Sequence, residues 1–319
     1  MTITPPVRRA RAIASPLLPL AVGPAMSASG GFLLIIATLI AAGRLDDRLL
    51  AEAIELVPGA RFAAWVEEGE AVDLEVDDGA AARTALEGWN GCDVIVQPVD
   101  GREKKLLAAD MDSTIIGQEC IDELADYAGI KPSIATITER AMRGELDFAA
   151  ALTERVALLE GLDVAIIARC LDERIRPNPG ATTLVRTMRG RGAGTLLLSG
   201  GFVDFVEPVA ALVGFEHHAA NVLAKDNSEL TGVIEGAIVD AEAKKAAMLI
   251  EREERGLDPA AVLAIGDGAN DIPLIIEAGL GVAFRAKPAL IAVADARLDH
   301  HGLDALLWAQ GIARKDWVI

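Results

Sequence analysis

The pattern of apolar and polar positions in the first third of the chain predicts a small domain of alternating strands and helices. Short apolar runs of strand length alternate with stretches in which apolar residues recur at helical spacing. The predicted order is a strand at 32–40, a helix at 46–57, strands at 61–66 and 71–76, a helix at 79–89 and a strand at 92–99. Because a βαββαβ order is typical of ferredoxin-like α+β domains, we assign residues 28–101 to one such domain.

The remainder of the chain predicts a parallel sheet that helices interrupt directly after its first strand. The apolar run at 106–109 has the length of a buried strand, and helical periodicity follows at 121–130, 134–142, 148–159 and 164–175. Beyond Pro177, helices alternate with β runs at 195–199, 262–266 and 280–284, and 221–239 has the turn residues of a hairpin. We therefore expect an α/β, Rossmann-like core at 102–117 and 177–319, with a helical cap inserted at 118–176.

The N-terminal stretch 1–27 superficially resembles a secretion signal, because arginines precede the apolar run Leu17–Val22. That run is short, and Pro16 and Pro19 break it. A second methionine, Met26, stands just before the first well-patterned segment. We therefore expect a disordered extension, or a start placed too early, in preference to an export signal. The run 32–42 is also too short for a membrane helix, which needs ~20 residues, so no membrane partner is expected.

The net charge and the cysteines narrow the partners and the location of the chain. The 319 residues carry a formal charge of −18, whereas nucleic-acid-binding surfaces are basic, so no nucleic-acid partner is expected. An anionic substrate would then need a local positive group or a metal ion. Cys92, Cys120 and Cys170 are widely spaced and form no Cys-x-x-Cys pair. They indicate reduced thiols and a cytoplasmic protein.

Two acidic residues, Asp110 and Asp112, directly follow the predicted strand at 106–109. Open α/β sheets bind ligands at the carboxyl ends of their strands, so this pair would lie at the active edge. Two carboxylates there could hold a hard cation and divide nucleophilic and proton-transfer roles, which is the chemistry of phosphoryl transfer through an aspartyl phosphate. An Asx turn or a helix N-cap would explain the same residues without catalysis, so the pair alone does not decide.

Two further segments have residues that could bind a phosphate group. In Ser199-Gly200-Gly201, a hydroxyl beside two glycines would let backbone amides approach an anion, although an ordinary strand-to-helix turn is equally compatible. Lys244 and Lys245 lie at the start of a helix predicted at 241–255, where one of them could neutralise a transferring phosphoryl group. The two lysines point about 100° apart on the helix, and a solvated helix face is the alternative for each.

A second acidic strand end follows the predicted strand at 262–266. Asp267 could complete a magnesium site with the first acidic pair, and Asn270 and Asp271 could brace it. A glycine-rich turn capped by an aspartate is the alternative. Two acid-bearing strand ends in one chain nevertheless favour a cation site.

Two adjacent histidine pairs stand out but do not indicate a ligand site. They are His217-His218 and His300-His301. Neighbouring side chains on a regular helix or strand diverge and do not face one ligand together. We therefore expect surface or turn histidines.

Taken in order, these segments resemble the haloacid dehalogenase superfamily of phosphotransferases. The segments are Asp110-Met-Asp112-Ser-Thr114, Ser199-Gly-Gly, Lys244 and Gly266-Asp267-Gly-Ala-Asn270-Asp271. Within the superfamily, 110–130, 141–148 and 239–244 are similar to the phosphoserine phosphatases, which act in the last step of serine biosynthesis. The N-terminal domain resembles the ACT-like regulatory domain of some members.

The resemblance implies roles for the acidic residues. Asp110 would attack phosphorus, while Asp112 would protonate the leaving serine oxygen and later activate the hydrolytic water. Mg²⁺ would be held by Asp110, the backbone carbonyl of Asp112, and Asp267. Asp271 would support the metal from behind these ligands.

The resemblance also implies how O-phospho-L-serine would be bound. Glu119 would meet the ammonium and Arg155 the carboxylate, and one acid with one bidentate guanidinium suits an amino-acid phosphate. Phe148 would line the pocket. The phosphate would contact Ser199, Gly200, Lys244 and Asn270.

Two alternative functions remain open. One is a phosphatase or phosphotransferase of the same superfamily that acts on another small phosphate ester. The other is a non-catalytic amino-acid sensor built around the N-terminal domain, which the intact Asp110 and Asp112 disfavour. An amino-acid ligand at the N-terminal domain and a homodimer are both compatible with the resemblance.

Overall fold

The first part of the described chain forms a four-stranded sheet with two helices. The computed structural model describes residues 34–319, so the extension predicted at 1–27 lies outside the described residues. The elements are β1 (Ile35–Ile40), α1 (Asp47–Leu56), β2 (Arg61–Glu67), β3 (Ala71–Val76), α2 (Gly79–Leu86) and β4 (Asp93–Pro98). Neighbouring strands are antiparallel, in the order β2-β3-β1-β4. The predicted βαββαβ order of elements is confirmed here.

A seven-stranded sheet forms the centre of the molecule. Its strands are β5 (Leu106–Ala109), β6 (Gly194–Phe202), β7 (His217–Asp226), β8 (Glu229–Glu235), β9 (Val262–Gly266), β10 (Leu280–Phe284) and β11 (Ala296–Leu298). They lie in the order β11-β10-β9-β5-β6-β7-β8, and every neighbouring pair is parallel except β7 with β8. This arrangement confirms the predicted Rossmann-like core with a parallel sheet.

Helices cover both faces of this sheet, which explains why its central strands read as continuous apolar runs. The covering helices are α7 (Ala181–Gly190), α8 (Val203–Val213), α9 (Ala241–Glu254), α10 (Ile272–Glu277), α11 (Pro288–Ile291) and α12 (Ala305–Ala309). Along β5, Leu106 and Ala108 pack with residues of α9, α10 and α11. Leu107 and Ala109 point the other way and pack with residues of α7, α8 and α12. Strand β5 is therefore buried on both sides.

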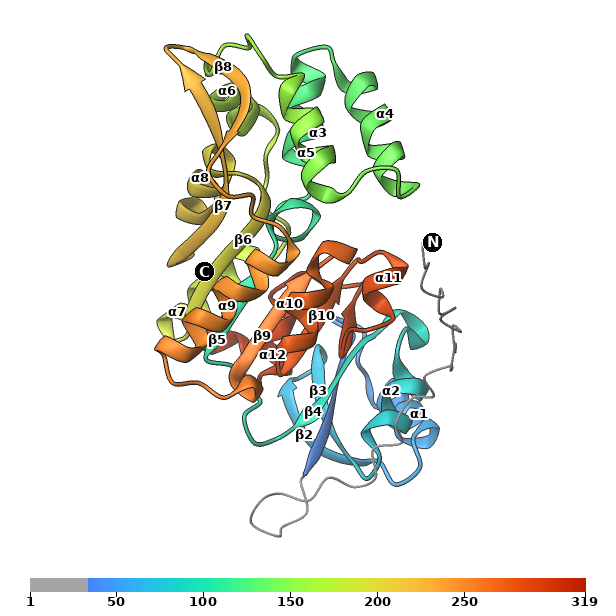
Figure 1. Ribbon diagram of the computed structural model, residues 1–319. Coiled ribbons are helices and arrows are strands. Elements are labelled where there is room, and N and C mark those ends of the chain that lie inside the picture. The colour runs from blue at the N-terminus through green and yellow to red at the C-terminus, as the bar shows by residue number, and fades with distance from the viewer. Residues whose placement is uncertain (1–33) are drawn as a thin grey trace, which may run out of the picture.

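Four helices between β5 and α7 form a separate layer above the carboxyl edge of the sheet (Figure 1). They are α3 (Cys120–Tyr127), α4 (Lys131–Met142), α5 (Phe148–Ala157) and α6 (Ala165–Arg174). The β7–β8 hairpin reaches this layer, because the backbone of Leu230 bonds both Gly161 and Leu162 in the loop after α5. A helical insert after the first core strand is thus present as predicted. No helix within residues 34–319 has the length and apolar character needed to cross a membrane.

Short helical turns complete the described chain. They are η1 (Trp89–Gly91), η2 (Met111–Ile115, a π-type turn), η3 (Pro259–Ala261), η4 (Ala269–Asp271) and η5 (Arg314–Asp316). Two of them, η2 and η4, come soon after β5 and β9; Asp112 lies in η2 and Asp271 in η4, whereas Asp110 and Asp267 lie between each strand and its turn. The helix predicted at 79–89 ends at Leu86, since Gly88 adopts a left-handed backbone with φ 72°.

The N-terminal sheet contacts the core through partly buried polar groups, among them Arg102, which bonds the carbonyl of Ala309 in α12. Arg102 also bonds Asp73 at 2.6 Å, and Asp73 accepts from Thr38 at 2.7 Å. The Nδ1 atom of His301 lies 2.7 Å from Asp93, whose carboxylate also accepts from the backbone of His301. His301 lies in the bend after β11, as expected of a turn histidine, but its side chain is only 12% exposed and its imidazole joins the N-terminal sheet to the core.

Candidate active site

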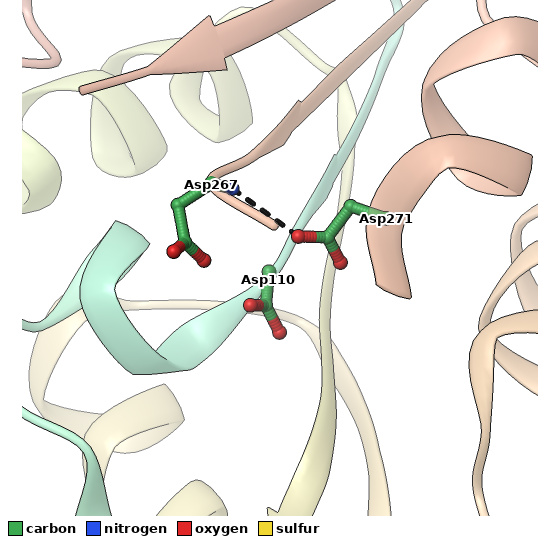
Figure 2. Close-up of side chains that lie close together, drawn as sticks. All are labelled: Asp110, Asp267 and Asp271. Atoms are coloured by element: carbon green, nitrogen blue, oxygen red, sulfur yellow. Dashed lines mark hydrogen bonds between the residues drawn. The ribbon is translucent and has the colours of Figure 1, made fainter. Parts of the chain in front are cut away.

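Three carboxylates meet at the carboxyl edge of the central sheet (Figure 2). Asp110 follows β5, Asp267 follows β9, and Asp271 lies in η4 beyond β9. Because β5 and β9 are parallel neighbours, the residues that follow them end up side by side. One oxygen of each carboxylate lies within 4.8 Å of the others. The two acidic strand ends that the sequence singled out therefore form one cluster.

Lys244 neutralises part of this acidic cluster. Its ammonium lies 2.6 Å from Asp110 and 3.0 Å from Asp271, and the side chain is only 1% exposed. Asp240 caps α9 by accepting from Ala243, so Lys244 projects from the first turn of the helix into the site. Lys245 pairs with Glu242 away from the site. The structure thus places Lys244, and not Lys245, beside the carboxylates.

The pKa values of Asp110 and Lys244 reflect the burial of both side chains and the charges around them. Burial, and next the carboxylate of Asp271, raise the pKa of Asp110 well above its usual range, although Lys244 opposes them. Burial lowers the pKa of Lys244, but Asp110 and Asp271 outweigh it, so the net shift is upward. The lysine therefore carries a positive charge in a site that excludes most water.

Asp112 lies between the sheet edge and the cap. Its Oδ1 accepts from the backbone amide of Cys120 at 2.7 Å, and its Oδ2 accepts from the Ser199 hydroxyl at 3.2 Å. The helix-capping alternative therefore holds in part, because Asp112 bonds the first residue of α3. Burial raises the pKa of Asp112, despite the bonds from Cys120 and Ser199. A raised pKa suits a carboxyl group that gives and takes a proton.

Ser199, Gly200 and Gly201 lie at the irregular end of β6, beside Asp112. The backbone amide of Gly201 donates to the Ser199 hydroxyl at 2.9 Å. A side chain on Gly201 would approach Asp112 to 3.1 Å, and one on Gly200 would meet the ring of Phe148 at 2.9 Å. Glycine at both positions keeps the backbone exposed to the space between the sheet edge and the cap.

Asp271 differs from the other two carboxylates because donors already surround it. One oxygen accepts from the backbone amides of Asp267 and Gly268, each at 3.2 Å, and the other accepts from Lys244 and Asn270. Asp267 instead contacts the ammonium of Lys287 at 3.0 Å, and burial raises its pKa. Asp271 is therefore held by donors from the protein, whereas Asp267 lines the cavity between the sheet edge and the cap.

A cavity of about 160 Å³ separates the sheet edge from the cap. Asp110, Asp112, Gly200, Asp267 and Asn270 line it from the core, and Glu119, Phe148 and Arg155 line it from the cap. Three predicted site residues, Ser199, Lys244 and Asp271, do not line the cavity but lie directly behind its lining: Ser199 bonds Asp112, and Lys244 bonds both Asp110 and Asp271. The structure therefore brings every predicted site residue to one place.

The two charged cap residues of the cavity have different surroundings. Glu119 accepts from the Ser113 hydroxyl at 2.8 Å. Glu119 is exposed, but the surrounding protein still removes part of its hydration, and this desolvation together with the carboxylate of Asp112 raises the pKa of Glu119 to about 7. Arg155 bonds the carbonyl of Ala151 in its own helix and has no carboxylate partner among the described residues. Both groups are thus available to a ligand.

Sequence reasoning did not assign Lys287 and Asn221 to this site, and it also left out Cys120, Ile121, Leu152 and Phe202, which line the cavity. Lys287 lines the cavity and contacts Asp267; its place just after β10, a third strand end at the same edge, was the signal. Asn221 is buried under Gly200 and bonds its carbonyl at 2.9 Å. It lies inside the stretch 221–239, which was expected to be a hairpin, and no feature of the sequence there indicated that Asn221 is buried beside the site.

Comparison with known proteins identifies the family to which these segments belong. The profile of the family described as haloacid dehalogenase-like hydrolase matches residues 107–275. A phosphoserine phosphatase from Archaeoglobus fulgidus is 42% identical over 242 residues, which cover 74% of this chain and 70% of that protein. A phosphoserine phosphatase from Albidiferax ferrireducens is 44% identical over 64% of this chain and 88% of its own length.

Solved structures agree with these sequence matches. A haloacid dehalogenase-family hydrolase from Salmonella enterica serovar Typhi superposes with a TM-score of 0.76 at 28% identity, over 86% of this chain and 98% of its own. The chain therefore belongs to the haloacid dehalogenase-like hydrolases and, within them, to the phosphoserine phosphatase family.

Proposed function

We propose that this chain hydrolyses O-phospho-L-serine to L-serine and phosphate through an aspartyl-phosphate intermediate. The observation that carries the proposal is the single cavity in which Asp110 and Asp112 of the core face Glu119 and Arg155 of the cap. The core side offers groups for phosphoryl transfer. The cap side offers one acid and one guanidinium, which match the ammonium and the carboxylate of an amino-acid phosphate.

The proposed reaction has two steps that use the two catalytic carboxyl groups in turn. In the first step, an Asp110 oxygen bonds phosphorus, the bond from phosphorus to the serine oxygen breaks, and Asp112 gives that oxygen a proton. In the second step, water attacks phosphorus, Asp112 takes a proton from the water, and the bond from Asp110 to phosphorus breaks. Phosphate leaves, and both carboxyl groups regain their starting states.

The same edge offers groups to hold the phosphate. We assign this role to Ser199, Gly200, Lys244 and Asn270, as the sequence predicted. The charge of Lys244 and the small side chains at the end of β6 support the assignment, since a buried cation and exposed amides stabilise a phosphoryl group.

The acidic cluster fits a magnesium ion. Its donors are hard carboxylate oxygens, which Mg²⁺ prefers over nitrogen or sulfur ligands. We assign Asp110, Asp267 and the backbone carbonyl of Asp112 as ligands, with Asp271 bracing them. When bound, the ion would neutralise negative charge on the phosphate.

A screen of phosphate release tests the proposed function. We expect phosphoserine to be hydrolysed with a higher kcat/KM than other small phosphate esters, and we expect a chelator to abolish the activity until Mg²⁺ is added back. A flat substrate profile would contradict the assignment of phosphoserine and favour the alternative of another phosphate ester. Activity that survives chelation would contradict the metal assignment.

An Arg155→Ala variant tests the proposed carboxylate clamp. We expect the KM for phosphoserine to rise about 10- to 100-fold, because a charge-assisted hydrogen bond contributes ~1.5–3 kcal/mol. Hydrolysis of an aryl phosphate, which has no such carboxylate, should change little. Arg169→Ala is the matched control, since Arg169 is an exposed cap arginine that pairs with Glu173. Equal losses on both substrates would contradict the clamp.

The pH dependence of kcat/KM tests the role of Glu119. Because the pKa of Glu119 is raised to about 7, this group is neutral below that pH and charged above it. The substrate ammonium needs the charged form, so kcat/KM for phosphoserine should rise as pH increases through about 7. Both phosphoserine and an aryl phosphate ionise at the phosphate group, near pH ~6. The rise in kcat/KM through about pH 7 should therefore be missing when the wild type hydrolyses an aryl phosphate and when Glu119→Gln hydrolyses phosphoserine. If all three pH profiles were identical, Glu119 would not be the group that binds the ammonium.

We further propose a domain division with an ACT-like N-terminal domain. The division is a domain at 28–101, a core at 102–117 and 177–319, and a cap at 118–176. The antiparallel sheet of β1 to β4 supports the first of these. The Salmonella hydrolase, which covers 86% of this chain, also matches more than the core and cap alone. An amino-acid ligand at this domain, a homodimer and a cytoplasmic location remain predictions.

A further inference from the structure

Asn221 joins two backbone segments beside the candidate active site. It lies on β7, next to β6, and its side chain is 1% exposed. Its Nδ2 donates to the carbonyl of Gly200 at 2.9 Å and more weakly to that of Val239 at 3.5 Å. Its Oδ1 accepts from the amide of Val239 at 2.8 Å. One buried amide thus connects the end of β6 to the segment before α9.

The first consequence concerns the peptide group between Gly200 and Gly201. Asn221 holds the carbonyl of this peptide, and the Ser199 hydroxyl accepts from its amide at 2.9 Å. Glycine has the widest range of backbone conformations, so two consecutive glycines need such restraints to stay in one orientation. A reoriented peptide could turn the negative end of its dipole toward the cavity that both glycines line.

The second consequence concerns the start of α9. Val239 precedes Asp240, whose side chain caps the helix by accepting from Ala243. The amide of Lys244 bonds the carbonyl of Asp240 at 3.0 Å. A fixed Val239 therefore fixes the first turn of the helix from which Lys244 reaches Asp110.

We propose that Asn221 is a positioning residue that sets the affinity of the site for the phosphate group. Its side chain fixes the position and orientation of the Gly200–Gly201 peptide relative to the start of α9. The inference rests on the proposed function only in assigning phosphate to this edge of the sheet. Because the phosphate group is common to all substrates, the residue acts on every phosphate ester, unlike Arg155.

The test is an Asn221→Asp variant. It keeps the shape of the side chain and the acceptor for Val239, but it places an oxygen against the carbonyl of Gly200. Losing this bond and setting one oxygen against another should release the Gly200–Gly201 peptide, and the KM for phosphoserine and for an aryl phosphate should both rise by about tenfold or more. The inhibition constant of inorganic phosphate should rise by a similar factor. Asn227→Asp is the control, since it makes the same chemical change at the exposed tip of the same hairpin.

Two further measurements keep the outcome decisive. Asn221→Ser removes the Gly200 contact without adding a charge, and it replaces Asn221→Asp if that variant fails to fold. Calorimetric titration with inorganic phosphate measures the affinity of the site for phosphate even if the wild type does not hydrolyse phosphoserine. The proposed function and the proposed role of Asn221 can therefore be contradicted separately. A folded Asn221 variant that binds phosphate as tightly as the wild type would overturn the role. A lower melting temperature with unchanged phosphate binding would show that Asn221 serves the fold alone.

Discussion

An Asp110→Asn variant is expected to lose about 10⁴-fold or more of its phosphate-release activity while it keeps its fold. An amide has the same shape as a carboxylate but is a far weaker nucleophile, so the aspartyl phosphate cannot form. Removing the nucleophile of an enzyme that uses covalent catalysis typically costs a factor of this size or larger. The measurement is the initial rate of phosphate release from phosphoserine at saturating Mg²⁺.

The stability of the same variant separates loss of chemistry from loss of structure. In the wild type, Asp110 and Asp271 are two buried carboxylates that share the ammonium of Lys244. A neutral amide in place of the Asp110 carboxylate removes the repulsion from Asp271, so the metal-free melting temperature should stay the same or rise. Asp47→Asn in α1 is the control, because that carboxylate is exposed. A folded Asp110→Asn enzyme with wild-type turnover would exclude the covalent mechanism.

The sequence was sufficient to predict which acidic residues meet. Asp110 and Asp267 each follow a short apolar run, and such runs are typical of strands buried on both faces of a parallel sheet. Parallel strands have their carboxyl ends at one edge, so two acids after two such strands are candidates for neighbours. The structure makes β5 and β9 adjacent, and the acids lie in one cluster. The hydrophobic pattern does not give the order of strands, which decides that adjacency and became visible only in the structure.

The sequence could not choose between Lys244 and Lys245, because the choice depends on packing. Both lysines lie in the first turn of α9, about 100° apart. The face that points to the sheet is set by residues such as Met248, one turn further along, which packs against β5 and β9. Lys244 is buried because of this packing and because the carboxylates of Asp110 and Asp271 lie within reach of its ammonium. The sequence around the two lysines does not show which of them faces the sheet.

The contacts of Asn221 and His301 could not be predicted for a related reason. Each makes its contacts with residues far away in sequence: Asn221 with Gly200, and His301 with Asp93. Polar side chains of this kind usually lie at the surface, so their burial becomes visible only when their partners are placed. The hydrophobic pattern predicts strands and helices well, but it says nothing of which polar groups pair across them.

A Lys244→Met variant is expected to be the most destabilised of the site variants. Methionine has a similar length but no charge, so Asp110 and Asp271 would face each other in a buried site without a counter-ion. Removing one partner of a buried ion pair typically costs about 3–5 kcal/mol in the free energy of unfolding. Phosphate release should also fall sharply, because the phosphoryl group loses its cation. Lys245→Met should change the free energy of unfolding little, since Lys245 forms a partly exposed pair with Glu242.

The pH dependence of the stability that Lys244→Met loses identifies the cause of that loss. The pKa of Asp110 is already raised by burial and by Asp271, and loss of the lysine should raise it further. A carboxyl whose folded-state pKa lies above its unfolded value favours folding below the unfolded value and loses that contribution as pH rises through the folded value. The difference in unfolding free energy between the wild type and Lys244→Met should therefore grow from acidic to neutral pH. A pH-independent difference would point to lost packing of the lysine stem, and no loss at all would mean that the two carboxylates do not both carry charge in the native site.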